Sequence, residues 1–310
     1  MLLNIILIKK KFYENIKKVF LLYIENLKIT IIKISNIYIM IPNYEYYDLI
    51  GIGDFSHGDK NIWVYRLKLL NYFIETTDKK ITIFNEDGDE HSKNIMNTSK
   101  KLSYYKSYGL YTNFGFGPLS KYCNRVYDSP IYLNFIKYIR KNKERINIIG
   151  IDPDVIKRDK QMSQNILKNI NKKHINLFFA HNNHINNQKI TEKYETKWHD
   201  EKYRCGYYIK QELKDKYCII LSTGYKGTIR FDCKCDDEYC TNRTSYEKPI
   251  FKSFKIKEYK NIENGLYDKF DKQIATYTAC DFPNNKPNMV NTNKYNYILF
   301  FRNIIPLELS

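Results

Sequence analysis

The sequence is poor in the residues that mark loop-rich chains. Only 12 glycines and 8 prolines occur among its 310 residues, whereas Lys, Asn, Ile and Tyr are abundant. This skew is typical of coding bias in an AT-rich genome, so the formal net charge of +17 carries less weight as evidence about function. A chain of this length can bury a full hydrophobic core, and one large domain is expected.

Nucleic-acid motifs are also missing. The lysines are spread along the chain, without a long basic arm, an RNA-binding aromatic signature or a zinc-finger spacing. This pattern favours a solvated basic surface over a nucleic-acid partner. No membrane partner is expected, because the apolar stretch from Ile29 to Ile41 is interrupted by Lys33 and is shorter than the roughly 20 residues that span a bilayer. Nothing in the sequence indicates an oligomeric state.

A secretion signal is not recognisable either. The apolar residues 1–8 precede three lysines, the reverse of a signal peptide's order. The seven cysteines are therefore expected to be reduced thiols of a cytoplasmic protein. Cys233, Cys235 and Cys240 cluster without paired CxxC knuckles, so a loop without metal is predicted there; a zinc site completed by a fourth ligand is the alternative.

Short apolar runs alternate with helical patterns along most of the chain. This alternation predicts an α/β fold with a largely parallel central sheet flanked by helices. The expected strands are Asp48 to Gly53, Ile81 to Phe84, Ile146 to Ile151, Ile175 to Ala180, Tyr217 to Ser222 and Tyr295 to Phe301. Helices are predicted at 61–75 and 131–142, and Val155, Met162, Ile166 and Ile170 share one face of another.

Two parts of the chain stand apart from this pattern. Residues 1–40 do not match the rest of the chain and are expected to be an N-terminal extension, with Met40 as a candidate start; residues 41–310 form the α/β domain. The stretch from Asp87 to Asp128 is polar and aromatic, without a clear period. A helical insertion or lid is expected there.

Polar side chains follow four consecutive predicted strands, at their carboxyl ends. They are Asp54 and His57, then Glu86, then Asp152, and finally His181 with His184. Ligands of open parallel sheets bind at this edge. A lone histidine after a strand is more often a loop residue than a catalyst. Several histidines and a glutamate at one edge supply an acid, a base and hydrogen-bond donors together, which favours an active site.

The first of these groups reads Gly53-Asp54-Phe55-Ser56-His57-Gly58 and precedes a helix that carries Arg66. Its glycines permit a tight turn that presents His57 at the sheet edge. An imidazole accepts a proton from water near neutral pH, and a carboxylate, Glu86 or Asp54, fixes its tautomer. No Gly-x-Ser-x-Gly elbow surrounds Ser56, so that serine is expected to be structural.

These motifs resemble the erythromycin esterase family. That family has Gly-Glu-x-x-His-Gly after its first strand, a helix with an Arg, a strand ending in Glu, and an Ala-His-Asn-x-His block. The matching positions here are Gly53 to Gly58, Arg66, Glu86, and Ala180 to His184. Further similar blocks are Phe135 to Arg140, Gly150 to Asp152, Arg158 to Asn165, Gly206 to Ile209, Thr223 to Gly227, and Tyr295 to Pro306. The resemblance covers about 45–307.

Two positions depart from the family pattern. The family's glutamate in the first motif is Asp54 here, and the tryptophan of its long helix is Tyr138. The segments that surround the substrate are shorter than in the macrolide esterases. These departures leave the substrate open.

The resemblance implies hydrolysis of a carboxylic ester or lactone, a macrolide lactone in the best-known members. His57 would be the general base, Glu86 and Asp54 its orienting carboxylates, and Arg66 with His181 the oxyanion stabilisers. His184 and Asp152 would contact the small-molecule substrate or support the site. No cofactor is implied. Two alternatives stay open: a divalent-metal-dependent hydrolase on the same residues, and a non-catalytic homologue that binds a small ligand.

Overall fold

The computed structural model describes residues 29–34, 37–56, 58–97, 99, 129–153, 157–189, 202–231, 250–261, 263–267, 274–276, 288–290 and 295–306. His57, Val155 and the cluster of Cys233, Cys235 and Cys240 lie outside these residues. The chain divides into two compact units, Met1–Tyr47 and Asp48–Ser310.

The part of the first unit that the structure describes contains a β-hairpin. β1 (Ile29–Ile34) and β2 (Ile37–Pro42) pair antiparallel, with Ile29 opposite Pro42. The apolar stretch at 29–41 is thus a pair of strands, which its many β-branched isoleucines favour. Among the described residues, no helix has the length and apolar character needed to cross a membrane.

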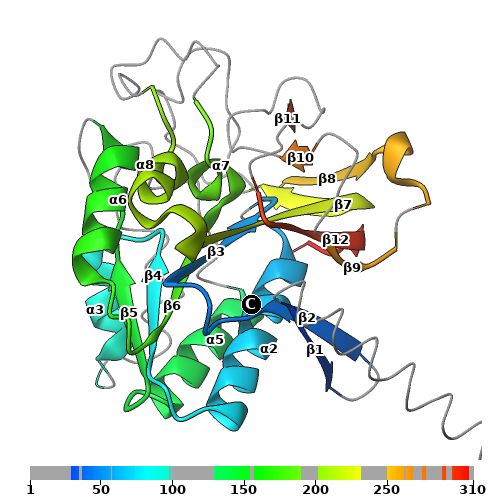
Figure 1. The fold of residues 1–310 in the computed structure, drawn as a ribbon. Helices are drawn as coiled ribbons and strands as arrows, with labels where there is room; N and C mark the ends of the chain where they lie inside the picture. The colour runs from blue at the N-terminus through cyan, green and yellow to red at the C-terminus, as the bar shows by residue number, and fades with distance from the viewer. Residues whose placement is uncertain are drawn as a thin grey trace, which may run out of the picture. The chain divides into compact units, whose positions relative to one another are not determined.

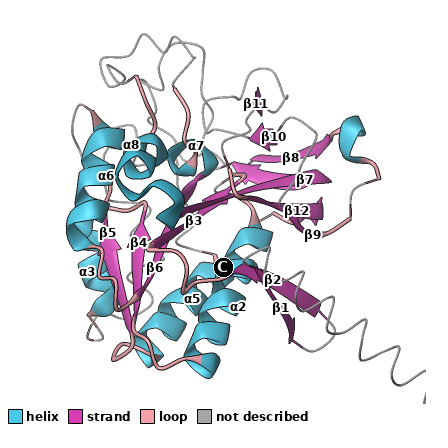
Figure 2. Cartoon of the chain, viewed as in Figure 1, coloured by secondary structure: helices cyan, strands magenta, loops and turns pink. Residues whose placement is uncertain are grey.

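The second unit is built on one sheet, shown in Figures 1 and 2. Its strand order is β5-β4-β6-β3-β7-β12-β9, with β8 beside β7. The strands are β3 (Leu49–Asp54), β4 (Ile81–Asn85), β5 (Ile146–Gly150), β6 (Ile175–His181), β7 (Tyr217–Phe231), β8 (Ile250–Lys255), β9 (Gly265–Tyr267) and β12 (Tyr297–Ile304). Neighbouring strands in the row β5-β4-β6-β3-β7-β12 pair parallel. β8 pairs antiparallel with β7, and β9 pairs antiparallel with β12. The predicted α/β fold with a mainly parallel sheet is confirmed. β10 (Ile274–Thr276) and β11 (Asn288–Val290) form a separate antiparallel pair.

Helices cover both faces of this sheet (Figure 1). On one face, α5 (Pro130–Lys141) contacts α2 (Lys60–Thr76) and α3 (Asp89–Met96). On the other, α8 (Cys205–Leu213) contacts α6 (Arg158–Asn169) and α7 (Asn182–Ile185). Right-handed crossovers explain this division, because connections that run toward β5 and connections that run toward β7 must use opposite faces. Two short 3-10 helices are η3 (Lys214–Lys216) and η4 (Lys257–Tyr259).

Side-chain caps define the starts of α2 and α5. The Asp59 carboxylate accepts a hydrogen bond from Asn61 N at 2.7 Å at the start of α2. The Ser129 hydroxyl accepts one from Tyr132 N at 3.3 Å, and Pro130 occupies the first turn of α5. Both satisfy backbone N–H groups that have no partner inside the helix.

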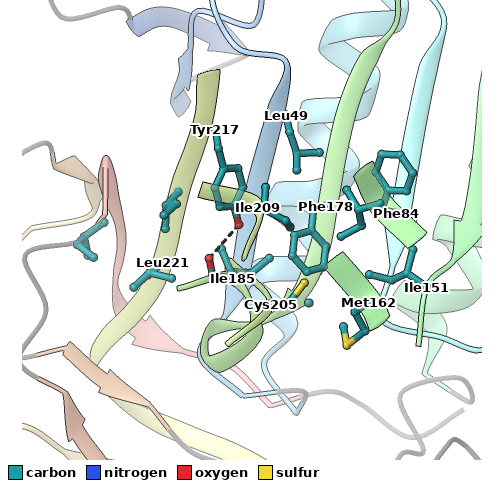
Figure 3. Close-up of a cluster of buried hydrophobic side chains, with 14 residues drawn as sticks. Leu49, Phe84, Ile151, Met162, Phe178, Ile185, Cys205, Ile209, Tyr217 and Leu221 are labelled. Atoms are coloured by element: carbon teal, nitrogen blue, oxygen red, sulfur yellow. Dashed lines mark hydrogen bonds between the residues drawn. The ribbon is translucent and has the colours of Figure 1, made fainter. Parts of the chain in front are cut away.

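The core between the sheet and α6, α7 and α8 is apolar, as Figure 3 shows. Alternate residues of β6 point to opposite faces, so that Phe178 and Ala180 lie in this core, whereas Phe179 packs near Phe135 of α5. Met162 and Ile166 are buried here, which confirms that these two positions share a helix face. The Tyr217 hydroxyl donates to Ile185 O at 2.9 Å and ties β7 to α7.

The connections leaving β4 and β6 run in opposite directions. The chain passes from β4 outward to β5, but from β6 past β3 to β7. Adjacent strands with diverging connections form a topological switch point, where ligands of open α/β sheets bind. The gap between the carboxyl ends of β4 and β6 is therefore the place where a site is expected.

The expected strands agree with the structure to within a few residues, except that β7 is much longer. The apolar run predicts an end at Ser222, but the strand continues to Phe231. It continues because β12 and β8 supply hydrogen-bond partners on its two edges. α3 lies in the segment expected to form an insertion or lid; residues 100–128 of that segment are outside the described ranges.

A tight contact between α7 and α8 yields a stability prediction. An added Cβ at Gly206 would overlap the backbone carbonyls of Ile185 and Asn186. Gly206→Ala should therefore lower the free energy of unfolding by about 1–3 kcal/mol, the usual cost of overpacking, although alanine favours a helix by up to about 1 kcal/mol. Urea denaturation measures the difference.

The matched control is Gly88→Ala at the start of α3. A Cβ there would meet nothing within 4 Å, and the backbone is extended. The control should change stability by about 1 kcal/mol at most. Equal losses in both variants would mean that the α7–α8 contact is not the constraint.

Candidate functional site

Four of the expected site residues lie at the carboxyl edge of the parallel strands. Asp54 is the last residue of β3 and His181 the last of β6, and the two stand opposite each other in the parallel register. Glu86 follows β4 and Asp152 follows β5. The pairing of these strands brings all four to one edge of the sheet.

Glu86 bridges the switch point between β4 and β6. Its Oε2 accepts a hydrogen bond from His181 N at 2.7 Å, and its own N donates to Phe179 O at 3.0 Å. The carboxylate is largely buried. Glu86 is thus joined to the end of β6 through both its backbone and its side chain.

Arg158, at the start of α6, joins several of these groups. Its Nε donates to Asp152 Oδ1 at 2.6 Å and its Nη2 to Asp152 Oδ2 at 2.7 Å, a bidentate pair. Nη2 also donates to Glu86 Oε1 at 2.9 Å, and Nη1 donates to His184 Nε2 at 2.8 Å. One guanidinium therefore connects the residues that follow β4, β5 and β6.

His184 lies between an arginine and an aspartate. Its Nδ1 is 2.7 Å from Asp159 Oδ1, which also accepts from Cys205 N at 2.8 Å. Arg204 Nη1 lies 3.8 Å from Asp159 Oδ2. Burial opposes ionisation of Asp159, but His184, Arg204 and Arg158 outweigh it and hold the pKa of this carboxyl below its usual value.

His181 has a defined tautomer in this arrangement. Its Nδ1 accepts a hydrogen bond from Asn183 N at 3.3 Å and so caps α7. A nitrogen that accepts from a backbone amide needs its lone pair, so the ring proton is assigned to Nε2. His181 therefore carries an Nε2–H donor at the end of β6.

The turn after His181 is held against neighbouring strands. The Asn182 amide donates to Ser222 O at 2.7 Å and accepts from Ser222 N at 3.0 Å. Asn182 also passes so close to Gly53 that an added Cβ there would lie 3.0 Å from Asn182 Cα. Gly53 is thus required by the close approach of two segments of the chain, the end of β3 and the start of α7.

Arg66, from α2, contacts the carboxyl ends of β3 and β6. Its Nη2 donates to Ile52 O at 2.9 Å and Ala180 O at 3.3 Å and lies 3.4 Å from Asp54 Oδ2. Its guanidinium stacks between Trp63 and Phe179, 4.9 and 4.8 Å from the ring centroids. Burial lowers the pKa of Arg66, although Asp54 and Glu86 oppose that change. Through these contacts Arg66 links the end of β3 to the end of β6.

The residues that follow Asp54 lead into the start of α2. Ser56 is buried, and its hydroxyl accepts from Gly58 N at 3.3 Å, in agreement with a structural part for this serine. Asp59 is fully buried, and its Oδ2 has no hydrogen-bond partner. Burial raises the pKa of Asp59 to about 8; the bond from Asn61 lowers it, and the charge of Asp54 raises it further.

The same residue types, His, Cys, Asp and Glu, could in principle bind a metal ion. Within the described ranges, no group of three or more His, Cys, Asp or Glu side chains is arranged to hold a metal ion. His57, which the metal-dependent alternative requires, lies outside those ranges.

Sequence reasoning missed Arg158, Asp159 and Arg204 as members of this network. The one signal was that Arg158 opens a block that resembles a helix of the erythromycin esterase family. Nothing in spacing shows that its side chain reaches Glu86, which is 72 residues away in the chain.

An open parallel sheet with ionisable side chains at its switch point defines an α/β protein that is suited to act on a small ligand at that edge. The sequence model of the erythromycin esterase family matches residues 133–238, which confirms the resemblance to that family over these residues; the blocks with Asp54, Arg66 and Glu86 precede them. The match contains most of α5, all of α6 and β6, and the His181 to His184 block. No curated protein matches the sequence.

Three solved structures are similar in fold. A protein from Bacillus cereus is 11% identical, with 86% of this chain and 91% of that chain covered and a TM-score of 0.56. A succinoglycan biosynthesis protein is 12% identical, with 86% and 90% covered and a TM-score of 0.57. A mutant of the erythromycin esterase EreC in its open conformation is 11% identical, with 84% and 92% covered and a TM-score of 0.54. Over residues 133–238 the sequence is erythromycin esterase-like, and the three solved structures show that the chain shares their fold.

The buried Asp59 carboxyl yields a pH-dependent prediction. Between about pH 4 and about pH 8 the folded chain keeps a proton that the unfolded chain has lost, so this group makes the free energy of unfolding fall as pH rises. Asp59→Asn keeps the cap acceptor but cannot ionise. The variant should match the wild type near the acid end of this window and exceed its stability by several kcal/mol at the alkaline end, since each pH unit in the window contributes about 1.4 kcal/mol.

Urea denaturation at both ends of the window measures this difference. Asp89→Asn is the control, because Asp89 lies in the first turn of α3 with an exposed side chain paired to Lys93. It should change stability by less than about 1 kcal/mol at either pH. A gain from Asp59→Asn that does not grow with pH would contradict the assignment.

Proposed function

We propose that the chain hydrolyses a carboxylic ester or lactone, using water activated by His57 as general base. The observation that carries this proposal is the hydrogen bond between Glu86 and His181 N, with Asp54 opposite His181 in the register. It joins three separate blocks of the family resemblance at the switch point of the sheet. His57 follows Asp54 by three positions in the first block.

Each carboxylate has a part in this proposal. Glu86 and Asp54 orient the His57 imidazole and stabilise the charge that it gains when it takes a proton from water. Glu86 is well suited, since bonds from Arg158 and His181 N stabilise its ionised form. Asp54 is held beside Arg66, which compensates its buried charge.

The oxyanion requires a donor, and His181 is the best candidate. The accepting Nδ1 leaves the ring proton on Nε2, where it can be donated to a developing negative charge. Arg66, expected to share this task, is buried with its Nη2 on Ile52 O and Ala180 O. We therefore assign Arg66 to positioning β3 and β6 and leave stabilisation of the oxyanion to His181.

The proposed reaction needs no covalent enzyme intermediate. Water loses a proton to His57 and attacks the carbonyl carbon, and the oxyanion forms beside His181. The tetrahedral intermediate then collapses, and the leaving alcohol takes the proton from His57. A general base and a preorganised donor each typically contribute about two or more powers of ten in rate.

His57→Ala should abolish hydrolysis and leave the fold nearly as stable. Loss of a general base removes about two to four powers of ten in rate. The stability cost should be about 0.5 kcal/mol or less, because His57 is proposed to act at the sheet edge and not in the core. Turnover of a panel of aryl esters and lactones and the melting temperature are measured on one preparation.

His174→Ala is the matched control. His174 precedes β6 at the opposite, amino end of the strand, where its Nδ1 lies 3.0 Å from the Thr82 hydroxyl. Its loss should leave turnover per folded molecule unchanged. A His57→Ala protein that melts early yet keeps wild-type turnover would remove His57 from the mechanism. Activity that a chelator abolishes would favour the metal-dependent alternative, and an inactive wild type that binds esters would favour the non-catalytic one.

A further inference from the structure

We infer that Arg158 is a positioning residue that fixes His184 as a singly protonated imidazole and holds the Glu86 carboxylate toward His181. The catalytic meaning of this inference rests on the proposed function, but the state of His184 does not. Arg158 does not touch the atoms proposed to react. It acts through the two side chains that it binds.

The shape of the guanidinium makes this arrangement possible. Nε and Nη2 bind the two oxygens of Asp152, which aligns the fork. The aligned fork then directs Nη2 to Glu86 Oε1 and Nη1 to His184 Nε2. A lysine presents its donors from a single nitrogen and cannot reproduce this planar set of bonds.

The contacts of His184 determine where its proton lies. An arginine has donors only, so Nε2 must offer its lone pair to Arg158 Nη1. The proton is then on Nδ1, where it is donated to Asp159 Oδ1 at 2.7 Å. With both nitrogens engaged in this way, His184 has no site for a second proton.

Two carboxylates lie beside the His184 ring. Glu86 Oε1 lies 3.3 Å from His184 Nε2, and Asp159 lies on the other side of the ring. Among the described residues, Asp152, Arg158 and Arg204 also carry charge in this network. Burial opposes the charge on Arg158, but the neighbouring carboxylates outweigh it and hold its pKa above the usual value, so the cation persists. Arg158 therefore takes the place that a second proton on His184 would occupy.

This arrangement restricts proton transfer at the sheet edge. A histidine that cannot gain a proton does not compete with His57 as base. Both Glu86 oxygens accept hydrogen bonds, Oε2 from His181 N and Oε1 from Arg158, and these bonds favour the carboxylate. His184 and Asp152, expected to contact the substrate or to support the site, are both engaged with Arg158, and we assign them the supporting part.

Nitrogen NMR spectra of the imidazole rings test the inference without any substrate. In the wild type at neutral pH, His184 should show a protonated Nδ1 and an unprotonated Nε2, with its signals assigned by their loss in His184→Gln. In Arg158→Met, which removes the donors, His184 should become doubly protonated between Glu86 and Asp159. Arg158→Lys should give an intermediate state.

Arg145→Met is the matched control. Arg145 precedes β5 at the opposite edge of the sheet, where it donates to Ile74 O at 3.0 Å and Lys79 O at 3.0 Å and also to Thr77 O. The Arg145→Met variant removes an arginine that is likewise bound through several hydrogen bonds, and it should leave the His184 signals unchanged.

With a hydrolysable ester, Arg158→Met should lower kcat about ten- to hundredfold with a smaller change in KM, because Glu86 loses its orientation.

The outcomes separate the two proposals. A wild-type His184 with its proton on Nε2, or one that is doubly protonated, would overturn the inference, and this holds even if Arg158→Met does not fold. Unchanged His184 signals in a folded Arg158→Met would overturn it as well. A wild type with the expected His184 signals but no activity on any ester would refute the proposed function and leave the state of His184 standing.

Discussion

The parallel pairing of β6 between β4 and β3 is the constraint on which the site depends. Every residue of β6 is buried, and the strand supplies side chains to the cores on both faces of the sheet. Its register places His181 beside Asp54 and brings Glu86 within reach of His181 N. A shift of one residue would turn its side chains to the wrong faces, and so the register is strongly specified.

Charge at this edge is balanced by two arginines that approach from opposite sides. Arg66, from α2, lies under β3 and β6, whereas Arg158, from α6, binds the residues that follow β4 and β5. Buried carboxylates are costly unless they are paired and hydrogen-bonded. The arginines therefore allow an edge rich in carboxylates to stay ionised, as the proposed chemistry requires.

His181 and His184 have different parts in the site because their hydrogen-bond partners differ. His181 and His184 belong to one short block, yet His181 caps α7 through Nδ1 and His184 lies between Arg158 and Asp159. The two histidines of one motif thus have different tautomers. Their distance in sequence is three residues, but their hydrogen-bond partners come from different elements.

The sequence by itself determined the α/β class, most strand positions and the edge at which the polar residues gather. Those features follow from local apolar periodicity and from the rule that parallel strands end at one edge. The sequence also carried the erythromycin esterase resemblance. Tertiary structure alone decided that Arg66 is buried under the strands, that β7 continues to Phe231, and that Arg158 joins Glu86, Asp152 and His184. These depend on partners far away in the chain, and the direction of a long side chain is set by the charges and carbonyls that the fold brings to it.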